Sequence, residues 1–123
     1  DFGLARVLEG NTSAIFTTTM GTVTHMPPEL FQLERSTIRL SKKADIYALG
    51  ILLWQVVMGQ MPFATMHAPQ VILFVARGRR LQLDESVPEE LCDLYRKCVL
   101  EDPRARPTFT EAFSKLCGLA LDD

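Results

Sequence analysis

One long apolar run constrains the fold of this chain more than any other feature of its sequence. Residues 46–54 contain no charged side chain, and after Gln55 the run continues through residues 56–58. A helix that is apolar on every face belongs in a protein core or in a membrane. The run is shorter than the roughly 18 to 20 residues that a membrane span requires. We therefore expect the central helix of a globular core, and no membrane segment in this chain.

The residues around the run give that helix its expected ends. Its charged start includes Lys42, Lys43 and Asp45. The hydroxyl of Ser41 is placed to cap the first turn, because serine favours that position. Gly59 follows the run, and glycine favours the left-handed conformation that ends many helices. The predicted helix extends from about Ser41 to Gly59.

Composition places the chain among globular proteins. Of its 123 residues, 47% are hydrophobic and 23% are charged, which excludes disordered and collagen-like classes. A net charge of −2 lacks the basic surplus of a nucleic-acid-binding domain, so we expect no nucleic acid partner. Three cysteines without a Cys-x-x-Cys pair indicate neither a disulfide framework nor a structural zinc site. They point to a reducing compartment, and we expect a cytoplasmic protein unless other segments carry a membrane anchor.

The rest of the chain predicts further helices joined by loops. Residues 8–25 are rich in hydroxyls and lack a helical period, which indicates a loop. Pro27 and Pro28 are suited to open a short helix, because proline fits a first turn. Residues 69–77 predict an apolar helix that ends at Gly78.

Two later helices are predicted with a capping box at their start. Apolar residues recur at helical spacing after the pair Ser86 and Glu89, and again after Thr108 and Glu111. In a capping box, the hydroxyl and the carboxylate three residues later each accept a backbone hydrogen bond. These patterns together predict a mainly α fold.

Five short motifs occur in order along the chain, and together they resemble a known family. The series resembles the C-terminal part of a eukaryotic protein kinase catalytic domain, from its Asp-Phe-Gly motif onward. The resemblance extends from residue 1 to about Leu119, and it implies a mainly α C-lobe fragment, in which an activation segment precedes a helical bundle around a buried central helix. The motifs are Asp1-Phe2-Gly3, Gly21-Thr22 running on to Pro27-Pro28-Glu29, Asp45-Ile46-Tyr47-Ala48-Leu49-Gly50, Gly59-Gln60-Met61-Pro62-Phe63, and Asp102-Pro103-Arg104-Ala105-Arg106-Pro107.

The resemblance also implies how the chain is organised. Residues 1–29 correspond to the Mg-binding motif, the activation segment and the substrate loop, residues 30–120 to the helical part of the C-lobe, and residues 121–123 to a tail. All belong to one incomplete protein kinase domain. The family's Gly-rich loop, strand lysine and catalytic loop are not among these residues. Because the chain opens on Asp1 and not on Met, we expect it to be a piece of a longer protein.

Further residues narrow the resemblance to the tyrosine-kinase-like group of Ser/Thr kinases. The region from Gln70 to Asp102 looks like that group, and Gly21-Thr22 is similar to the Ser/Thr-specific form of the substrate loop. The family usually has Tyr where His25 stands, and Trp where Tyr47 stands. Both departures are mild, and the one at His25 puts the substrate detail in doubt but not the fold.

The resemblance assigns the family's cofactors, ATP and Mg²⁺, to the start of the chain. Asp1 would hold Mg²⁺ against the nucleotide phosphates, because a hard carboxylate oxygen suits a hard cation. Phe2 would be the packing residue that separates active from inactive arrangements, and Gly3 would permit the sharp turn beside it. Thr22 would contact the catalytic Asp and Lys of the upstream loop. An ordinary turn remains the alternative for Asp1.

The loop from Leu8 to Met20 matches the activation segment, which implies phosphorylation. Thr18 stands where the family often carries its activating phosphate, and a phosphate there can order the loop by pairing with arginine. An upstream activating kinase or autophosphorylation would supply it. Competing acceptors are Thr17, Thr19, Thr12 and Ser13.

Three charged residues are expected to be structural. Glu29 would pair with Arg106, far along the sequence, in a bidentate and partly buried ion pair. Asp45 would accept hydrogen bonds from the backbone of the catalytic loop, since a carboxylate beside an apolar run needs partners. The alternative for Asp45 is a favourable interaction with the helix dipole.

These residues predict part of an ATP-dependent Ser/Thr protein kinase that transfers the γ-phosphoryl group to hydroxyls of a protein substrate. Phosphoryl transfer depends on positioning groups, and most of the family's positioning groups are absent here. We therefore expect residues 1–123 alone to be inactive. One alternative is a pseudokinase or scaffold that binds protein partners without catalysis. Another is a freestanding helical interaction module.

Overall fold

The computed structural model describes residues 23–31 and 42–121, and every regular element in those two ranges is a helix. The mainly α fold class is therefore confirmed. The loop predicted over residues 8–25 lies almost wholly outside the described residues. The elements are the 3-10 helix η2 (Pro28–Phe31), α3 (Lys42–Met58), α4 (Ala68–Ala76), α5 (Glu89–Cys98), the 3-10 helix η3 (Pro103–Ala105) and α6 (Phe109–Leu121).

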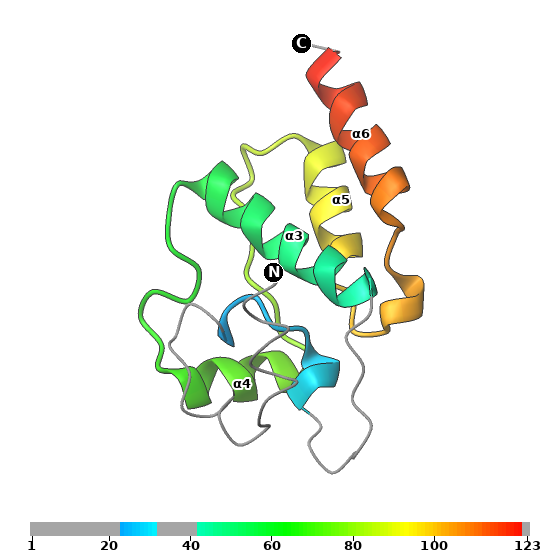
Figure 1. The fold of residues 1–123 in the computed structure, drawn as a ribbon. Helices are drawn as coiled ribbons and strands as arrows, with labels where there is room; N and C mark the ends of the chain where they lie inside the picture. The colour runs from blue at the N-terminus through cyan, green and yellow to red at the C-terminus, as the bar shows by residue number, and fades with distance from the viewer. Residues whose placement is uncertain (1–22, 32–41, 122–123) are drawn as a thin grey trace.

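Helix α3 crosses the middle of the molecule (Figure 1). Helices α5 and α6 pack against each other on one side of it, and α4 and η2 pack together on the other. The helix ends as predicted: its last residue is Met58, Gly59 has a φ of +66°, and the Gly59 N–H donates to the carbonyl of Gln55 at 2.9 Å. Ser41, the predicted cap, lies outside the described residues.

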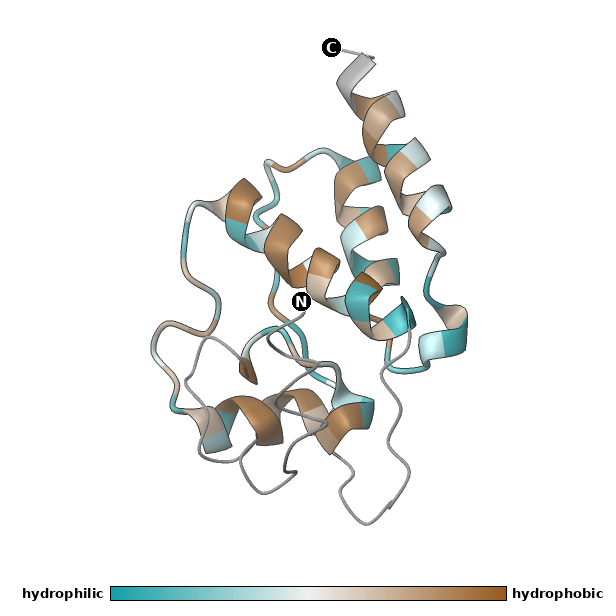
Figure 2. Cartoon of the chain, viewed as in Figure 1, coloured by the Kyte–Doolittle hydropathy of each residue, from teal (hydrophilic) through white to brown (hydrophobic). Residues whose placement is uncertain are grey.

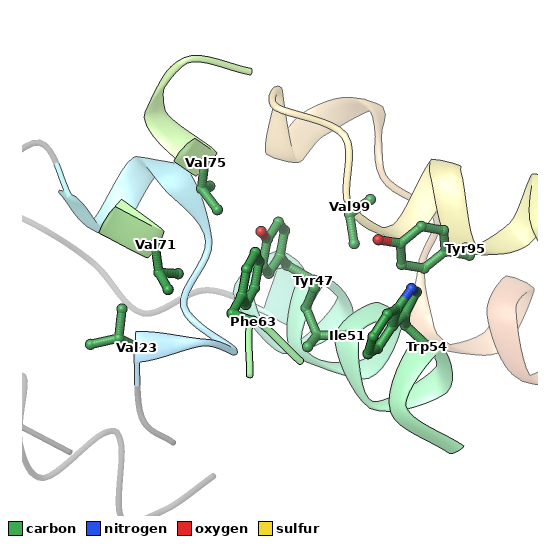
Figure 3. Close-up of a cluster of buried hydrophobic side chains, with 9 residues drawn as sticks. All are labelled: Val23, Tyr47, Ile51, Trp54, Phe63, Val71, Val75, Tyr95 and Val99. Atoms are coloured by element: carbon green, nitrogen blue, oxygen red, sulfur yellow. The ribbon is translucent and has the colours of Figure 1, made fainter. Parts of the chain in front are cut away.

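The main core forms where the two sides meet α3. Tyr47, Ile51 and Trp54 of α3 lie between side chains from α4 and from α5 (Figure 3). A smaller cluster joins α3, α5 and α6 through Ile46 and Ala112. The nine buried residues of the main core are Val23, Tyr47, Ile51, Trp54, Phe63, Val71, Val75, Tyr95 and Val99.

Burial of the central helix is confined to part of its surface. Hydrophobic residues run along α3 and α4 (Figure 2), yet Leu52 is 48% exposed and Val56 is 70% exposed. The expected buried central helix is present, but none of the described segments packs over Leu52 and Val56. No helix there is both long and apolar enough to cross a membrane.

Helix α3 approaches α5 so closely that one position between them admits no side chain. A Cβ atom added at Gly50 would lie 2.8 Å from Cγ1 of Val99 and 2.9 Å from Cβ of Cys98. Real Cβ atoms do not come this close to their neighbours. Gly50 therefore sets the distance between the two helices.

The predicted start of α5 is wrong, whereas that of α6 is confirmed. Helix α5 begins at Glu89 after Pro88, and the N–H of Ser86 donates to Oδ1 of Asp84 in the preceding turn. The residue before a proline is disfavoured in the α conformation, so a helix cannot readily begin at residue 87. At α6, the Thr108 N–H donates to Oε1 of Glu111 at 2.9 Å, and the Glu111 N–H donates to Oγ1 of Thr108 at 3.1 Å.

Candidate functional site

The structure describes only some of the residues singled out in the sequence. Glu29, Asp45 and Arg106 lie within the described ranges. The remaining candidates, for metal, nucleotide, substrate and phosphate, lie outside them, and their roles stay predictions. They are Asp1, Phe2, Gly3, Thr17, Thr18, Thr19 and Thr22.

The segment that directly follows Thr22 is anchored by buried apolar side chains. Val23 and Met26 are each 1% exposed, and Leu30 is fully buried. Two turn hydrogen bonds shape the segment, from the Met26 N–H to the Val23 carbonyl and from the Leu30 N–H to the Pro27 carbonyl. Its η2 portion packs against α4. The short helix predicted after the two prolines is thus present, as a single 3-10 turn.

Glu29 and Arg106 form the predicted bidentate ion pair. Nη1 of Arg106 donates to Oε2 of Glu29 at 3.0 Å, and Nη2 donates to Oε1 at 2.8 Å. The Arg106 side chain is completely buried and the Glu29 side chain is one quarter exposed. A charge at this depth is stable only with well-placed partners. The pair therefore fixes η2 against the loop before α6, 77 residues later in the chain.

The Arg106 guanidinium also binds three backbone carbonyls. Nε donates to Leu100 at 2.8 Å, Nη1 donates to Lys43 at 2.9 Å, and Nη2 makes a longer contact of 3.4 Å with Glu101. In return, Nζ of Lys43 donates to the Arg106 carbonyl at 2.6 Å. One side chain thus holds η2, the first turn of α3 and the loop after α5 in fixed relation.

Tyr47 lies between two arginines. Its ring centre is 5.2 Å from the Arg106 guanidinium carbon and 5.6 Å from that of Arg80, within the range of cation–π interactions. Burial raises the pKa of Tyr47 to about 12, although the two arginines act in the opposite direction. Its hydroxyl is buried and makes no hydrogen bond within the described residues. Sequence reasoning treated Tyr47 only as a mild departure and missed this contact.

The segment between α4 and α5 is held by side chains that the sequence did not single out. Nε1 of Trp54 donates to the Gln82 carbonyl at 2.9 Å, and the Tyr95 hydroxyl donates to the Leu81 carbonyl at 2.7 Å. Arg80 donates through Nε to the Val99 carbonyl at 2.7 Å. In the sequence these three side chains stand out only as long residues with a polar end group among apolar neighbours. That pattern does not identify the carbonyls to which they donate.

Asp45 lies in the first turn of α3, where its side chain is exposed. Among the described residues it forms no hydrogen bond or ion pair, while its position suits the positive end of the helix dipole. The expected partner, the backbone of a catalytic loop, is not part of this chain. The described ranges also contain no group of three or more His, Cys, Asp or Glu residues able to hold a metal ion.

Comparison with known proteins decides the family. A family model described as protein tyrosine and serine/threonine kinase matches residues 1–116. The chain belongs to this protein kinase family. It corresponds to the part of the catalytic domain that begins at the Asp-Phe-Gly motif, as the order of motifs indicated.

Curated relatives of this kinase chain carry serine/threonine kinase names. A putative serine/threonine-protein kinase/receptor of Acanthamoeba polyphaga mimivirus is 34% identical over 116 residues, which is 94% of this chain and 7% of the relative. A probable serine/threonine-protein kinase of Arabidopsis thaliana is 33% identical over 94% of this chain and 11% of its own length. A probable LIM domain-containing serine/threonine-protein kinase of Dictyostelium discoideum is 30% identical over 90% of this chain and 16% of its own length. The chain thus spans a small part of each relative.

Proposed function

We propose that this chain is the activation-segment and substrate-binding part of an ATP- and Mg²⁺-dependent protein kinase that phosphorylates serine and threonine. The observation that carries the proposal is the buried Glu29–Arg106 pair, which fixes the segment directly after Gly21-Thr22. A substrate must be held in one geometry for in-line phosphoryl transfer, so a rigid support beneath the substrate loop serves that chemistry. The Ser/Thr kinase names of the relatives favour the same acceptors.

The chemistry at the nucleotide is assigned to the start of the chain. Asp1 would hold Mg²⁺ against the phosphates, Gly3 would permit the turn beside it, and Thr22 would contact the catalytic Asp and Lys of the upstream loop. Thr18 is the first choice for an activating phosphate, with Thr17 and Thr19 beside it. The phosphate comes from an upstream kinase or from autophosphorylation. We place the protein in the cytoplasm, where its three free cysteines would stay reduced.

Residues 1–123 alone are proposed to be inactive. The exposed apolar residues of α3, with Val56 at 70% exposure, are consistent with this, because exposed apolar patches often mark where further structure or a partner packs. The base and the strand lysine of the reaction also come from outside these residues. Turnover of Mg·ATP and a peptide by residues 1–123 would overturn this part of the proposal.

The test uses the complete protein with Mg²⁺, γ-labelled ATP and peptides whose only hydroxyl is serine, threonine or tyrosine. We expect label on serine and threonine peptides, and its loss in Asp1→Asn. Asp93→Asn is the matched control, because Asp93 forms only an exposed pair with Lys97. Label on tyrosine alone would contradict the acceptor class. If neither the native protein nor the control variant labels any peptide, while the protein still binds its protein partners, the result would favour the scaffold alternative.

A further inference from the structure

A groove of about 710 Å³ lies between the end of α4 and α5, and Glu29 and Arg106 take no part in it. Its apolar lining comes from both helices and from the segment that connects them, and charged side chains stand beside it. The apolar lining includes Phe74, Leu81, Leu83, Tyr95 and Val99, and the exposed charged residues are Arg79, Arg96 and Glu101.

The accessible charge of the groove is mainly positive. Arg79 is exposed, and its side chain forms no hydrogen bond or ion pair with any described residue. Arg96 makes one contact with Glu89 at 3.4 Å, between side chains that are 58% and 86% exposed, and such a pair is weak. Arg80, which also lines the groove, is committed to backbone carbonyls. The groove therefore presents two available guanidinium groups against one carboxylate, in a chain whose net charge is −2.

The backbone along the groove offers unused hydrogen-bond donors. The carbonyls of Leu81 and Gln82 accept from Tyr95 and Trp54, which fixes this segment to the core. Within the described residues, the N–H groups of Leu81, Gln82 and Leu83 donate to no protein acceptor. Residues 79–84 form no helix, turn or strand (Figure 1). Backbone N–H groups require acceptors, and a second chain lying alongside can supply its carbonyls.

We propose that this groove binds an extended segment of a partner protein in which apolar and acidic side chains alternate. In an extended chain, successive side chains point to opposite sides, so apolar ones can enter the groove while acidic ones face Arg79 and Arg96. Those N–H groups of residues 81–83 that face the segment bind its carbonyls, as in peptide recognition by strand addition. The surface acts in docking, and it does not depend on phosphoryl transfer.

The test is made on the complete protein without ATP, so that its outcome is separate from that of the kinase proposal. Short random linear peptides displayed on phage are selected against it, and the enriched sequence is made as a fluorescent peptide. We expect alternating apolar and acidic residues. We expect Arg79→Glu combined with Arg96→Glu to weaken binding of that peptide by about tenfold or more, since complementary charges are replaced by like charges.

The matched control is Arg104→Glu combined with Lys115→Glu, which changes the net charge equally at exposed residues away from this groove. It should leave the affinity within about twofold, because neither residue lines the groove and interactions between exposed charges are weakened by solvent and salt. Equal weakening in both double variants would overturn the proposal, as would a basic or uncharged consensus or no enrichment at all. Binding to vesicles of phosphatidylcholine and phosphatidylserine, lost with Arg79→Glu and Arg96→Glu while no peptide is enriched, would assign the groove to a membrane surface instead.

Discussion

Two arginines in the loop between α5 and α6 stand in contrasting environments. Arg106 is completely buried and bonded to Glu29 and to three backbone carbonyls, whereas Arg104, two residues earlier, is 91% exposed and paired with Asp102 at 3.3 Å. The same side chain thus occurs in both settings within one short loop. A buried and fully bonded charge determines how distant segments meet, while an exposed pair adds little to stability. The predictions below test that difference.

The largest effect is expected for Arg106→Met. The substitution leaves the Glu29 carboxylate partly buried without its partner, which costs roughly 3 to 5 kcal/mol of unfolding free energy. Arg104→Met removes only an exposed pair and should cost about 0 to 1 kcal/mol. Urea unfolding of the complete kinase domain measures both. Similar losses in the two variants would remove the distinction between the arginines.

A second test concerns Tyr47, which lies beside Arg106. Its pKa is raised from 10.0 to about 12 on folding, so its contribution to stability is complete below pH 10 and is lost as the pH rises toward 12. Two pKa units correspond to about 3 kcal/mol. Tyr47→Phe should remove this part of the alkaline loss and leave stability at neutral pH unchanged or higher, because the hydroxyl has no hydrogen-bond partner in the part of the chain that the structure describes.

Unfolding free energies measured from pH 8 to 12 check this expectation. Tyr95→Phe is the comparison, because burial raises the pKa of Tyr95 as well but its hydroxyl donates to Leu81. That variant should lose stability at neutral pH. A neutral-pH loss in Tyr47→Phe would show that the Tyr47 hydroxyl has a partner, such as a buried water.

A third test compares two glycines in helices. Gly50→Ala places a Cβ within 2.9 Å of side-chain atoms of Cys98 and Val99, at the end of α5, and should cost about 1 to 3 kcal/mol through overpacking. Gly118→Ala in α6 meets nothing within 4 Å and should gain about 0.5 to 1 kcal/mol from helix propensity. Thermal unfolding of the complete domain distinguishes the signs. A gain at Gly50 would mean that α3 and α5 can separate at little cost.

The smallest effect is expected at the two predicted capping boxes, those of α5 and α6. Thr108→Ala removes a hydroxyl that accepts the Glu111 N–H and should cost about 1 kcal/mol. Ser86→Ala removes a hydroxyl that makes no capping bond and should change stability by less than about 0.5 kcal/mol. Urea midpoints of the two variants measure the contrast. A larger loss at Ser86 would restore the predicted start of α5.

The features of this structure that could be predicted from the sequence were those set by local residue patterns and by the motifs of the family. The C-terminal end of α3, the capping box of α6 and the Glu29–Arg106 pair followed from periodicity, turn residues and motif order. The capping box of α5 failed because the pattern ignored the constraint that Pro88 places on the residue before it. The contacts of Tyr47 with Arg80 and Arg106 could not be predicted, because they join distant segments through no recurring spacing. The nucleotide-site residues lie outside the described ranges, so for them sequence remains the whole basis.

The fluorescence of Trp54 can report on one contact of the core. Trp54 is the chain's single tryptophan, and its indole N–H donates to the carbonyl of Gln82 in the segment beside the groove. Indole emission depends on burial and on hydrogen bonding at the ring nitrogen. When other tryptophans of the complete protein are replaced by phenylalanine, fluorescence therefore follows the attachment of residues 79–84 to α3. Peptide docking or local opening of that segment becomes visible without an added dye.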